Sequence, residues 1–282
     1  MTLRGAVLAL ATALLAATCA FAAQPELVRD RTTPASQAAD AALLQSLDHD
    51  VFLEGSYAGP TGKLGYRLMP PATVQQGKRY PLVIVLHGSG AIGNDNIRQL
   101  GALAMSWSAP AIRKRFPAYV LAPQFAERSA NYKPSAVDGL LAAQPGPNLP
   151  SLLALVEQLK PQYAIDSDRI YVTGFSMGAS AATQAVLQNS GMFAAAVAFS
   201  GIAPERAAAA QLKDLPLLLV HGDADTENSI LADRAMFAAL QRQPGGAKAR
   251  FIEYQGMEHM VPPDMLFSPV WRDWLFAQRK AR

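Results

Sequence analysis

The segment Arg169-Ile170-Tyr171-Val172-Thr173-Gly174-Phe175-Ser176-Met177-Gly178 decides the fold of this chain. Its apolar first half predicts a short buried strand over 169–173, and the alanine-rich run Ala179–Gln188 predicts a helix behind it. A serine at such a junction lies on a tight turn, and the flanking glycines remove side chains that would collide with the strand and helix. The turn exposes the Ser176 hydroxyl, which makes it a candidate nucleophile. The alternative is that Ser176 only caps the helix, since serine is a favoured N-cap residue.

Three further apolar runs end in polar loops and are predicted to be strands. They are Pro81–Leu86 before His87-Gly88-Ser89-Gly90, Pro216–Val220 before His221-Gly222-Asp223-Ala224-Asp225, and Ala249–Tyr254 before Gly256-Met257-Glu258-His259. Near-continuous apolar runs are typical of strands buried on both faces of a parallel sheet. Open α/β sheets carry their sites at the carboxyl ends of the strands, so these loops are expected to meet at one edge.

The loops supply a candidate catalytic triad in the order Ser176, an aspartate, then His259. An imidazole must take the serine proton, and a carboxylate must hold that imidazole in the right tautomer. We predict Asp225 as the acid, because it lies one step further from the strand end than Asp223, which is expected to accept hydrogen bonds from loop N–H groups. Glu258 is the weaker alternative, because adjacent loop residues such as 258 and 259 rarely face each other.

Two backbone N–H groups are predicted to form an oxyanion hole. The first is that of Met177, at the start of the helix behind Ser176, where the helix dipole also favours negative charge. The second is that of Ser89, with its neighbour Gly90 as the alternative donor. His87 and His221 each precede a glycine at a strand end and are interpreted as structural or pocket-wall residues.

The walls of the substrate pocket are harder to predict. Asn96–Trp107 is predicted to be a helix, and Phe125–Gly146 is the longest stretch with no regular pattern. That stretch follows a strand end and is expected to lie over the site, with Trp107, Gln124 and Tyr132 as candidate wall residues. The alternative is that these aromatic residues simply close the core.

The first 22 residues predict a secretory signal peptide. Arg4 precedes the apolar run Ala6–Ala17, and Ala20-Phe21-Ala22 matches the small-x-small cleavage pattern. Lipidation at Cys19 is a less favoured alternative, since the residues before it do not match that signal. The sequence thus predicts a periplasmic or secreted protein whose mature form lacks cysteine, with a lead-in over 23–45 and one catalytic domain over 46–282. The apolar run Ala6–Ala17 is too short for a stable membrane span.

Composition limits the classes of partner. The chain has 282 residues, half of them hydrophobic, which suits one large core. Its formal net charge is only +3, with no basic block, so nucleic-acid binding is not indicated. His49 lies between Asp48 and Asp50, but no ligand cluster supports a metal site. Composition does not determine the oligomeric state.

With these motifs, the sequence resembles the α/β hydrolases. Within that superfamily it is similar to the small secreted esterases and predicted peptidases related to phospholipase/carboxylesterases and polyhydroxybutyrate depolymerases. The segments that carry the resemblance are 80–90, 93–96 with 99–100, 163–178 and 271–279. The resemblance implies a mostly parallel sheet flanked by helices, with no large lid domain and no cofactor. It assigns Ser176 as nucleophile, Asp225 as acid, His259 as base, and Ser89 and Met177 as oxyanion donors.

One departure from the family is Ala179, where a second glycine often follows the turn. Its methyl group is expected either to narrow the pocket or to tighten the helix packing. The predicted function is hydrolysis of small-molecule or polymeric carboxylic esters through an acyl-enzyme intermediate. The alternatives are a serine peptidase with the same triad, and a non-catalytic polymer- or carbohydrate-binding protein of the same fold.

Overall fold

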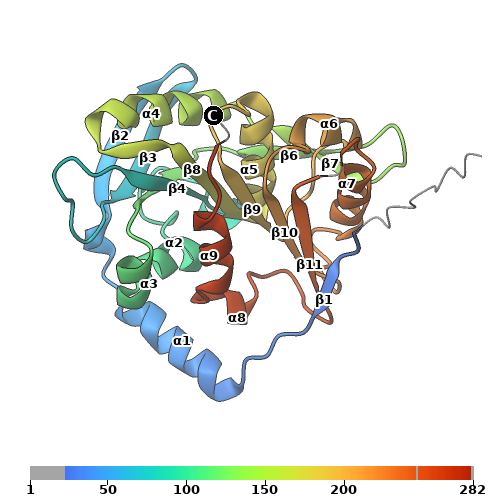
Figure 1. Ribbon diagram of the computed structural model, residues 1–282, viewed down its shortest axis with the longest axis horizontal. Helices are drawn as coiled ribbons and strands as arrows, with labels where there is room; N and C mark the ends of the chain where they lie inside the picture. Colours follow the sequence, from blue (N-terminus) through green and yellow to red (C-terminus); the bar gives the residue numbers. More distant parts are fainter. Residues whose placement is uncertain (1–22, 246, 281–282) are drawn as a thin grey trace, which may run out of the picture.

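The computed structural model describes residues 23–245 and 247–280; the predicted signal peptide, with Cys19, lies outside them. A central sheet of nine strands runs through this part of the chain in the order β1-β11-β10-β9-β8-β4-β5-β3-β2 (Figure 1). The strands are β1 (Glu26–Val28), β2 (Leu53–Gly59), β3 (Gly62–Met69), β4 (Tyr80–Leu86), β5 (Tyr119–Gln124), β8 (Ile165–Phe175), β9 (Ala195–Phe199), β10 (Leu217–Gly222) and β11 (Ala249–Tyr254).

The sheet is mostly parallel, as the sequence predicted. Only β2 with β3 and β3 with β5 pair antiparallel, and every other neighbouring pair is parallel. All seven residues of the central strand β4 are buried, which fits a strand covered on both faces. The carboxyl ends of β4, β8, β10 and β11 therefore reach the same edge.

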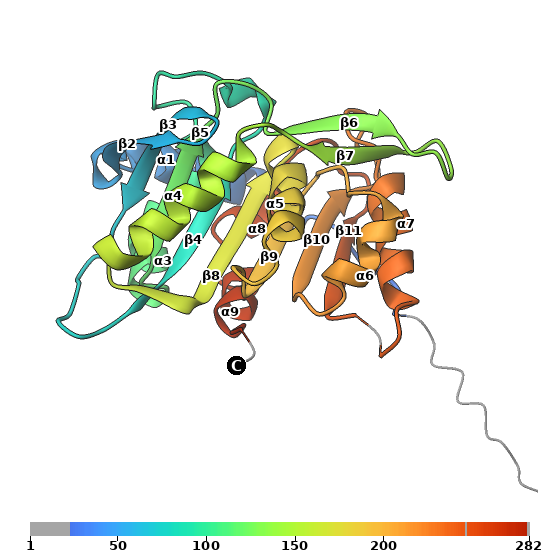
Figure 2. The same cartoon turned by 90° about the horizontal axis from the view of Figure 1, so that it is seen from above.

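Helices cover both faces of the sheet (Figure 2). One face carries α4 (Leu149–Gln162), α5 (Met177–Gln188), α6 (Ala209–Leu212) and α7 (Leu231–Gln241); the other carries α1 (Pro34–Ser46), α2 (Ala102–Met105), α3 (Pro110–Arg115), α8 (Pro263–Leu266) and α9 (Val270–Phe276). Alternate residues of β4 enter the two cores: Leu82, Ile84 and Leu86 join one, and Val83 and Val85 the other. The predicted fold class, a mostly parallel sheet flanked by helices, is confirmed.

The predicted helix over 96–107 is wrong. Asn96 has a φ of 55°, in the left-handed region, and the Asp95 carboxylate accepts hydrogen bonds from the N–H groups of Ile97 and Arg98. These contacts make a turn in place of a first helical turn. Helical structure starts only after Gly101, with the short α2.

The stretch predicted to be irregular contains a hairpin, β6 (Ala130–Pro134) with β7 (Leu141–Pro145). It packs on α5, where the Gln184 side chain donates to the Ala143 carbonyl at 2.6 Å. The lead-in also holds unexpected structure, because β1 pairs in parallel with the outer edge of β11. Within the described ranges, no helix is both long enough and apolar enough to cross a membrane.

Candidate active site

Ser176 occupies a strained turn between β8 and α5. Its backbone has φ 57° and ψ −122°, which a residue with a side chain adopts only when its surroundings enforce it. Close backbone packing on either side enforces it here. A Cβ built on Gly178 would lie 2.1 Å from the Leu86 carbonyl oxygen, and one on Gly174 would lie 2.4 Å from the Gly178 carbonyl carbon. Only glycine fits at both positions, as the sequence pattern indicated.

The structure brings together the three side chains predicted to form the triad. The Ser176 hydroxyl lies 2.9 Å from His259 Nε2, and His259 Nδ1 lies 2.6 Å from Asp225 Oδ2. When Nδ1 donates to the carboxylate, Nε2 is free to accept the serine proton. The His259 ring also packs on Phe175, with ring centroids 4.8 Å apart. The Asp225 side chain is fully buried, so its charge is screened little by solvent.

The two aspartates of the β10 loop have different surroundings. The second oxygen of Asp225 accepts hydrogen bonds from the N–H groups of Glu227 and Asn228, at 2.9 and 2.8 Å. Asp223 instead accepts from the Gly256 N–H at 2.6 Å in an exposed turn, as expected for a loop-capping residue. The weaker alternative acid, Glu258, is exposed.

His87 fixes the loop that carries the predicted second oxyanion donor. The Phe125 N–H donates to His87 Nε2 at 3.0 Å, so Nδ1 carries the hydrogen and donates to the Gly88 carbonyl at 2.8 Å. Burial lowers the pKa of His87, with the Gly88 hydrogen bond opposing this, and the ring is therefore neutral. In a trans peptide the N–H points opposite to the carbonyl, so the Ser89 N–H points away from His87. A Cβ on Gly88 would lie 3.6 Å from Ser176 Cβ, which places this loop beside the candidate nucleophile.

Two residues that sequence reasoning missed join the loops of the acid and the base. The Ser200 hydroxyl donates to the Met260 carbonyl at 3.0 Å, and the Asn228 side chain donates to the Ser200 carbonyl at 2.8 Å. Ser200 directly follows β9 and has a φ of 50°. Neither residue belongs to a recognisable motif, because their partners lie 60 and 28 positions away along the chain. Of the two expectations for Ala179, the structure supports tighter packing, since its methyl group is buried against Gly201.

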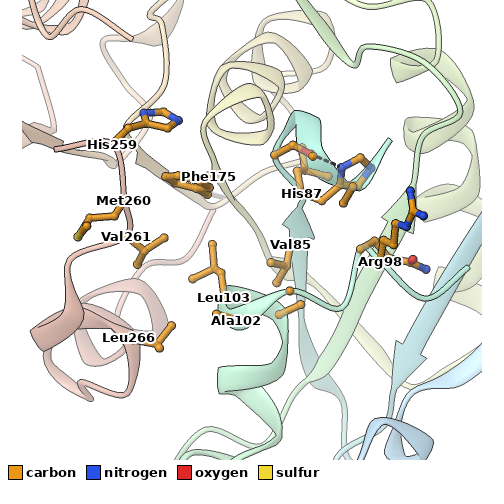
Figure 3. A pocket seen from close by; sticks show the side chains of 17 residues that line it. Val85, His87, Arg98, Ala102, Leu103, Phe175, His259, Met260, Val261 and Leu266 are labelled. Carbon is orange, nitrogen blue, oxygen red and sulfur yellow. Dashed lines mark hydrogen bonds between the residues drawn. The ribbon is translucent and has the colours of Figure 1, made fainter. Parts of the chain in front are cut away.

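A cavity of about 500 Å³ opens beside His259 (Figure 3). Its walls are mostly apolar and come from distant parts of the chain, with Val85, Ala102 and Leu103 on one side and Met260, Val261 and Leu266 on the other. The predicted wall residues do not line it. Trp107 is 1% exposed and packs edge-on against Trp271 in the core, while the Gln124 side chain accepts from the Asn96 N–H. Tyr132 lies on the hairpin, with its hydroxyl 3.4 Å from that of Ser180.

No set of three or more His, Cys, Asp or Glu side chains within residues 23–245 and 247–280 is placed to hold a metal ion. A serine hydroxyl beside an imidazole nitrogen can transfer an acyl group, because the imidazole can take the proton while the serine oxygen attacks a carbonyl carbon.

Comparisons with known proteins give similar folds. A family model described as Phospholipase/Carboxylesterase matches residues 147–268, which include Ser176, Asp225 and His259. A thermostable esterase of known structure is 28% identical, with a TM-score of 0.72, over 82% of this chain and 64% of the esterase. The chain therefore spans less than two thirds of that relative's length. Among curated proteins, no match is found.

More distant structures share the fold alone. A ferulic acid esterase from the anaerobic fungus Anaeromyces mucronatus is 16% identical, with a TM-score of 0.58, over 80% of this chain and 90% of the esterase. A putative dipeptidyl aminopeptidase IV from Bacteroides ovatus is 21% identical, with a TM-score of 0.56, over 80% of this chain and 35% of the peptidase.

Proposed function

Because this chain belongs to the α/β hydrolase superfamily, we propose that it is a serine hydrolase that cleaves carboxylic esters through an acyl-enzyme intermediate. One observation carries the proposal: the hydrogen-bonded chain from Ser176 through His259 to the buried carboxylate of Asp225. These three side chains supply a nucleophile, a base and a group that orients the base, and they are held on three different loops at one edge of the sheet.

In the proposed reaction the Ser176 oxygen attacks the ester carbonyl while its proton passes to His259 Nε2. The N–H groups of Met177 and Ser89 stabilise the resulting oxyanion. The C–O bond to the alcohol then breaks, and the proton on His259 passes to the leaving oxygen. A water molecule then attacks the acyl-enzyme while its proton passes to His259 Nε2. When the bond to the Ser176 oxygen breaks, His259 returns that proton to Ser176, and the carboxylic acid is released. Asp225 stays ionised throughout and stabilises the imidazolium of His259.

The apolar cavity beside His259 indicates which esters fit. Its volume of about 500 Å³ is within the range of small-molecule sites, and its facing walls are made of Ala102, Leu103, Val261 and Leu266. Burying an apolar group there is favourable by about 25 cal/mol per Å². We therefore propose that the substrate carries a bulky apolar acyl or alcohol group that occupies this cavity.

Ala102→Phe tests the use of the cavity. Ala102 is exposed at the start of α2 and lines the cavity, so a phenyl ring there fills space without disturbing the core. We expect kcat/KM for esters with bulky apolar groups to fall by at least about tenfold, which corresponds to about 1.4 kcal/mol, whereas an acetyl ester of a small alcohol keeps its rate. The control is Ala111→Phe, an equally exposed position on α3 that does not line the cavity. Equal losses for large and small esters would contradict this use of the cavity.

The proposed activity is tested by measuring hydrolysis of p-nitrophenyl esters of increasing acyl length, each beside its p-nitroanilide analogue. We expect ester turnover that depends on acyl size and slower turnover of the anilides, because an amide nitrogen is a poorer leaving group and must be protonated as the bond breaks. Faster cleavage of the anilides would favour a peptidase, and no turnover of either series would contradict the proposal.

A further inference from the structure

A second pair of histidine and carboxylate lies directly behind the candidate triad. His221 is fully buried at the end of β10, and Asp233 is buried in the first turn of α7. Their side chains meet with His221 Nδ1 2.8 Å from Asp233 Oδ2. On its other side, His221 Nε2 lies 3.2 Å from Asp225 Oδ2 and 2.9 Å from the Asn228 carbonyl oxygen. A line of contacts thus runs from Asp233 through His221 and Asp225 to His259.

Every partner of the His221 ring is a hydrogen-bond acceptor. Carboxylate oxygens and a backbone carbonyl have no proton to donate. A neutral imidazole carries one N–H, so its second nitrogen would turn a lone pair toward an acceptor oxygen in a site without solvent, which is costly. A doubly protonated ring donates on both sides, and its charge is balanced by two carboxylates.

We propose that His221 is a buried imidazolium that positions Asp225 and partly neutralises its charge, and so acts as a positioning residue for the ester hydrolysis proposed above. With it, all hydrogen-bonding positions of Asp225 are occupied. One oxygen accepts from the N–H groups of Glu227 and Asn228, and the other accepts from both His221 and His259. The carboxylate cannot rotate away from His259 without breaking these bonds.

The other charges around His221 are consistent with this protonation. On β11, Glu253 lies in register with His221 and forms an ion pair with Arg234 of α7, so those two charges offset each other. Strand β9, the other neighbour of β10, carries no charged residue. Burial on its own would lower the pKa of His221, but Asp233, the Asn228 carbonyl and Asp225 together raise it above its ordinary value. The stabilisation from this proton is thus present at low pH and is lost as the pH rises through the raised pKa.

This cation has a consequence for the pH dependence of the reaction. His221 and His259 contact the same oxygen of Asp225, so a positive charge on His221 opposes protonation of His259. Removing the cation is expected to move the acidic limb of the profile of kcat/KM against pH to higher pH.

The protonation state is tested directly by NMR on the wild-type protein with ¹⁵N-labelled histidine. At the pH of the acidic limb of the activity profile we expect both ring nitrogens of His221 to give shifts of protonated nitrogen, each coupled to a proton that is protected from exchange with solvent. An unprotonated ring nitrogen in His221 would overturn the proposal. Because this experiment measures no turnover, its failure is separate from any failure of the proposed function.

The effect on the reaction is tested by measuring kcat/KM against pH for Asp233→Asn, which removes the carboxylate that holds the second proton on His221. We expect the acidic limb to move to higher pH, with KM unchanged. The control, Asp223→Asn, also removes a negative charge from this region but one outside the chain of contacts, and it should leave the limb in place.

The direction in which the acidic limb moves in Asp233→Asn decides between a charged and a neutral His221. If His221 were neutral, Asp233→Asn would only remove a negative charge and would move the limb to lower pH or not at all. Either of those results, in a variant whose circular dichroism shows it to be folded, would overturn the proposal. His221→Gln gives a second route, since it removes the cation while keeping an N–H donor, and it should shift the limb in the same direction. If the wild-type protein hydrolysed no ester, the proposed function would fail instead.

Discussion

Ser176→Ala is expected to lower kcat for ester hydrolysis by a factor of at least about a thousand, the scale of loss when a triad nucleophile is removed. The fold should persist, because the glycines at 174 and 178 and their close backbone contacts hold the turn, and alanine keeps the same Cβ. The measurement is kcat under saturating ester, with thermal unfolding of both proteins measured alongside it.

The matched control is Ser89→Ala. Ser89 is exposed beside the site, and we propose that only its backbone N–H acts, so losing its hydroxyl should leave most of the activity. A Ser176→Ala protein that hydrolysed esters at nearly the wild-type rate would contradict the assignment of the nucleophile.

Asp225→Asn is expected to lower kcat/KM by about ten-thousandfold, as when a triad carboxylate becomes an amide. An amide nitrogen facing His259 Nδ1 favours the tautomer in which Nε2 carries the hydrogen, and that nitrogen then cannot accept the serine proton. The same exchange at Asp223, whose carboxylate accepts a hydrogen bond from the loop N–H of Gly256, should cost less than about tenfold. Steady-state kinetics of the two variants compare them directly. A larger loss at Asp223 than at Asp225 would reassign the acid.

The sequence predicted those parts of the site that depend on local pattern. Gly174 and Gly178 flank a serine at a junction of strand and helix, and short-range sterics alone require that arrangement. The predicted strands before His87, Asp225 and His259 are all present, with β11 beginning and ending where expected. Parallel strands bring their carboxyl ends to one edge, so residues 83 positions apart meet there.

Features that depend on packing between distant segments were not predictable. The cavity is lined by residues from the β4–α2 region, by Phe175 of β8 and by residues between β11 and the end of α8. No pattern within these segments indicates that they face one another. Trp107, a candidate for that wall, packs edge-on against Trp271 in the core, which is the alternative that the sequence left open. In the sequence, Asp233 likewise looks like an ordinary helix residue. It lies beside His221 only because α7 packs against the sheet next to β10.

The prediction of a helix over 96–107 was wrong because the backbone forms an irregular turn at residues 95–98. Its apolar spacing suits a helix, yet the Asp95 side chain takes up the N–H groups of residues 97 and 98, and Asn96 adopts a left-handed conformation. Side chains that bond their neighbouring backbone compete with helix formation in this way. The turn matters for the site, since Gly101 and Ala102 just beyond it line the cavity.

Formation of a covalent acyl-enzyme at Ser176 is tested by labelling with an activated p-nitrophenyl phosphonate ester that carries an apolar alkyl group. This reagent transfers its phosphonyl group to an activated serine and releases one p-nitrophenolate. We predict one label per protein molecule, located by peptide mass spectrometry on Ser176, with loss of activity in proportion to labelling and no label in Ser176→Ala. Inactivation with the label on another residue, or an active enzyme that takes up no label, would contradict the account.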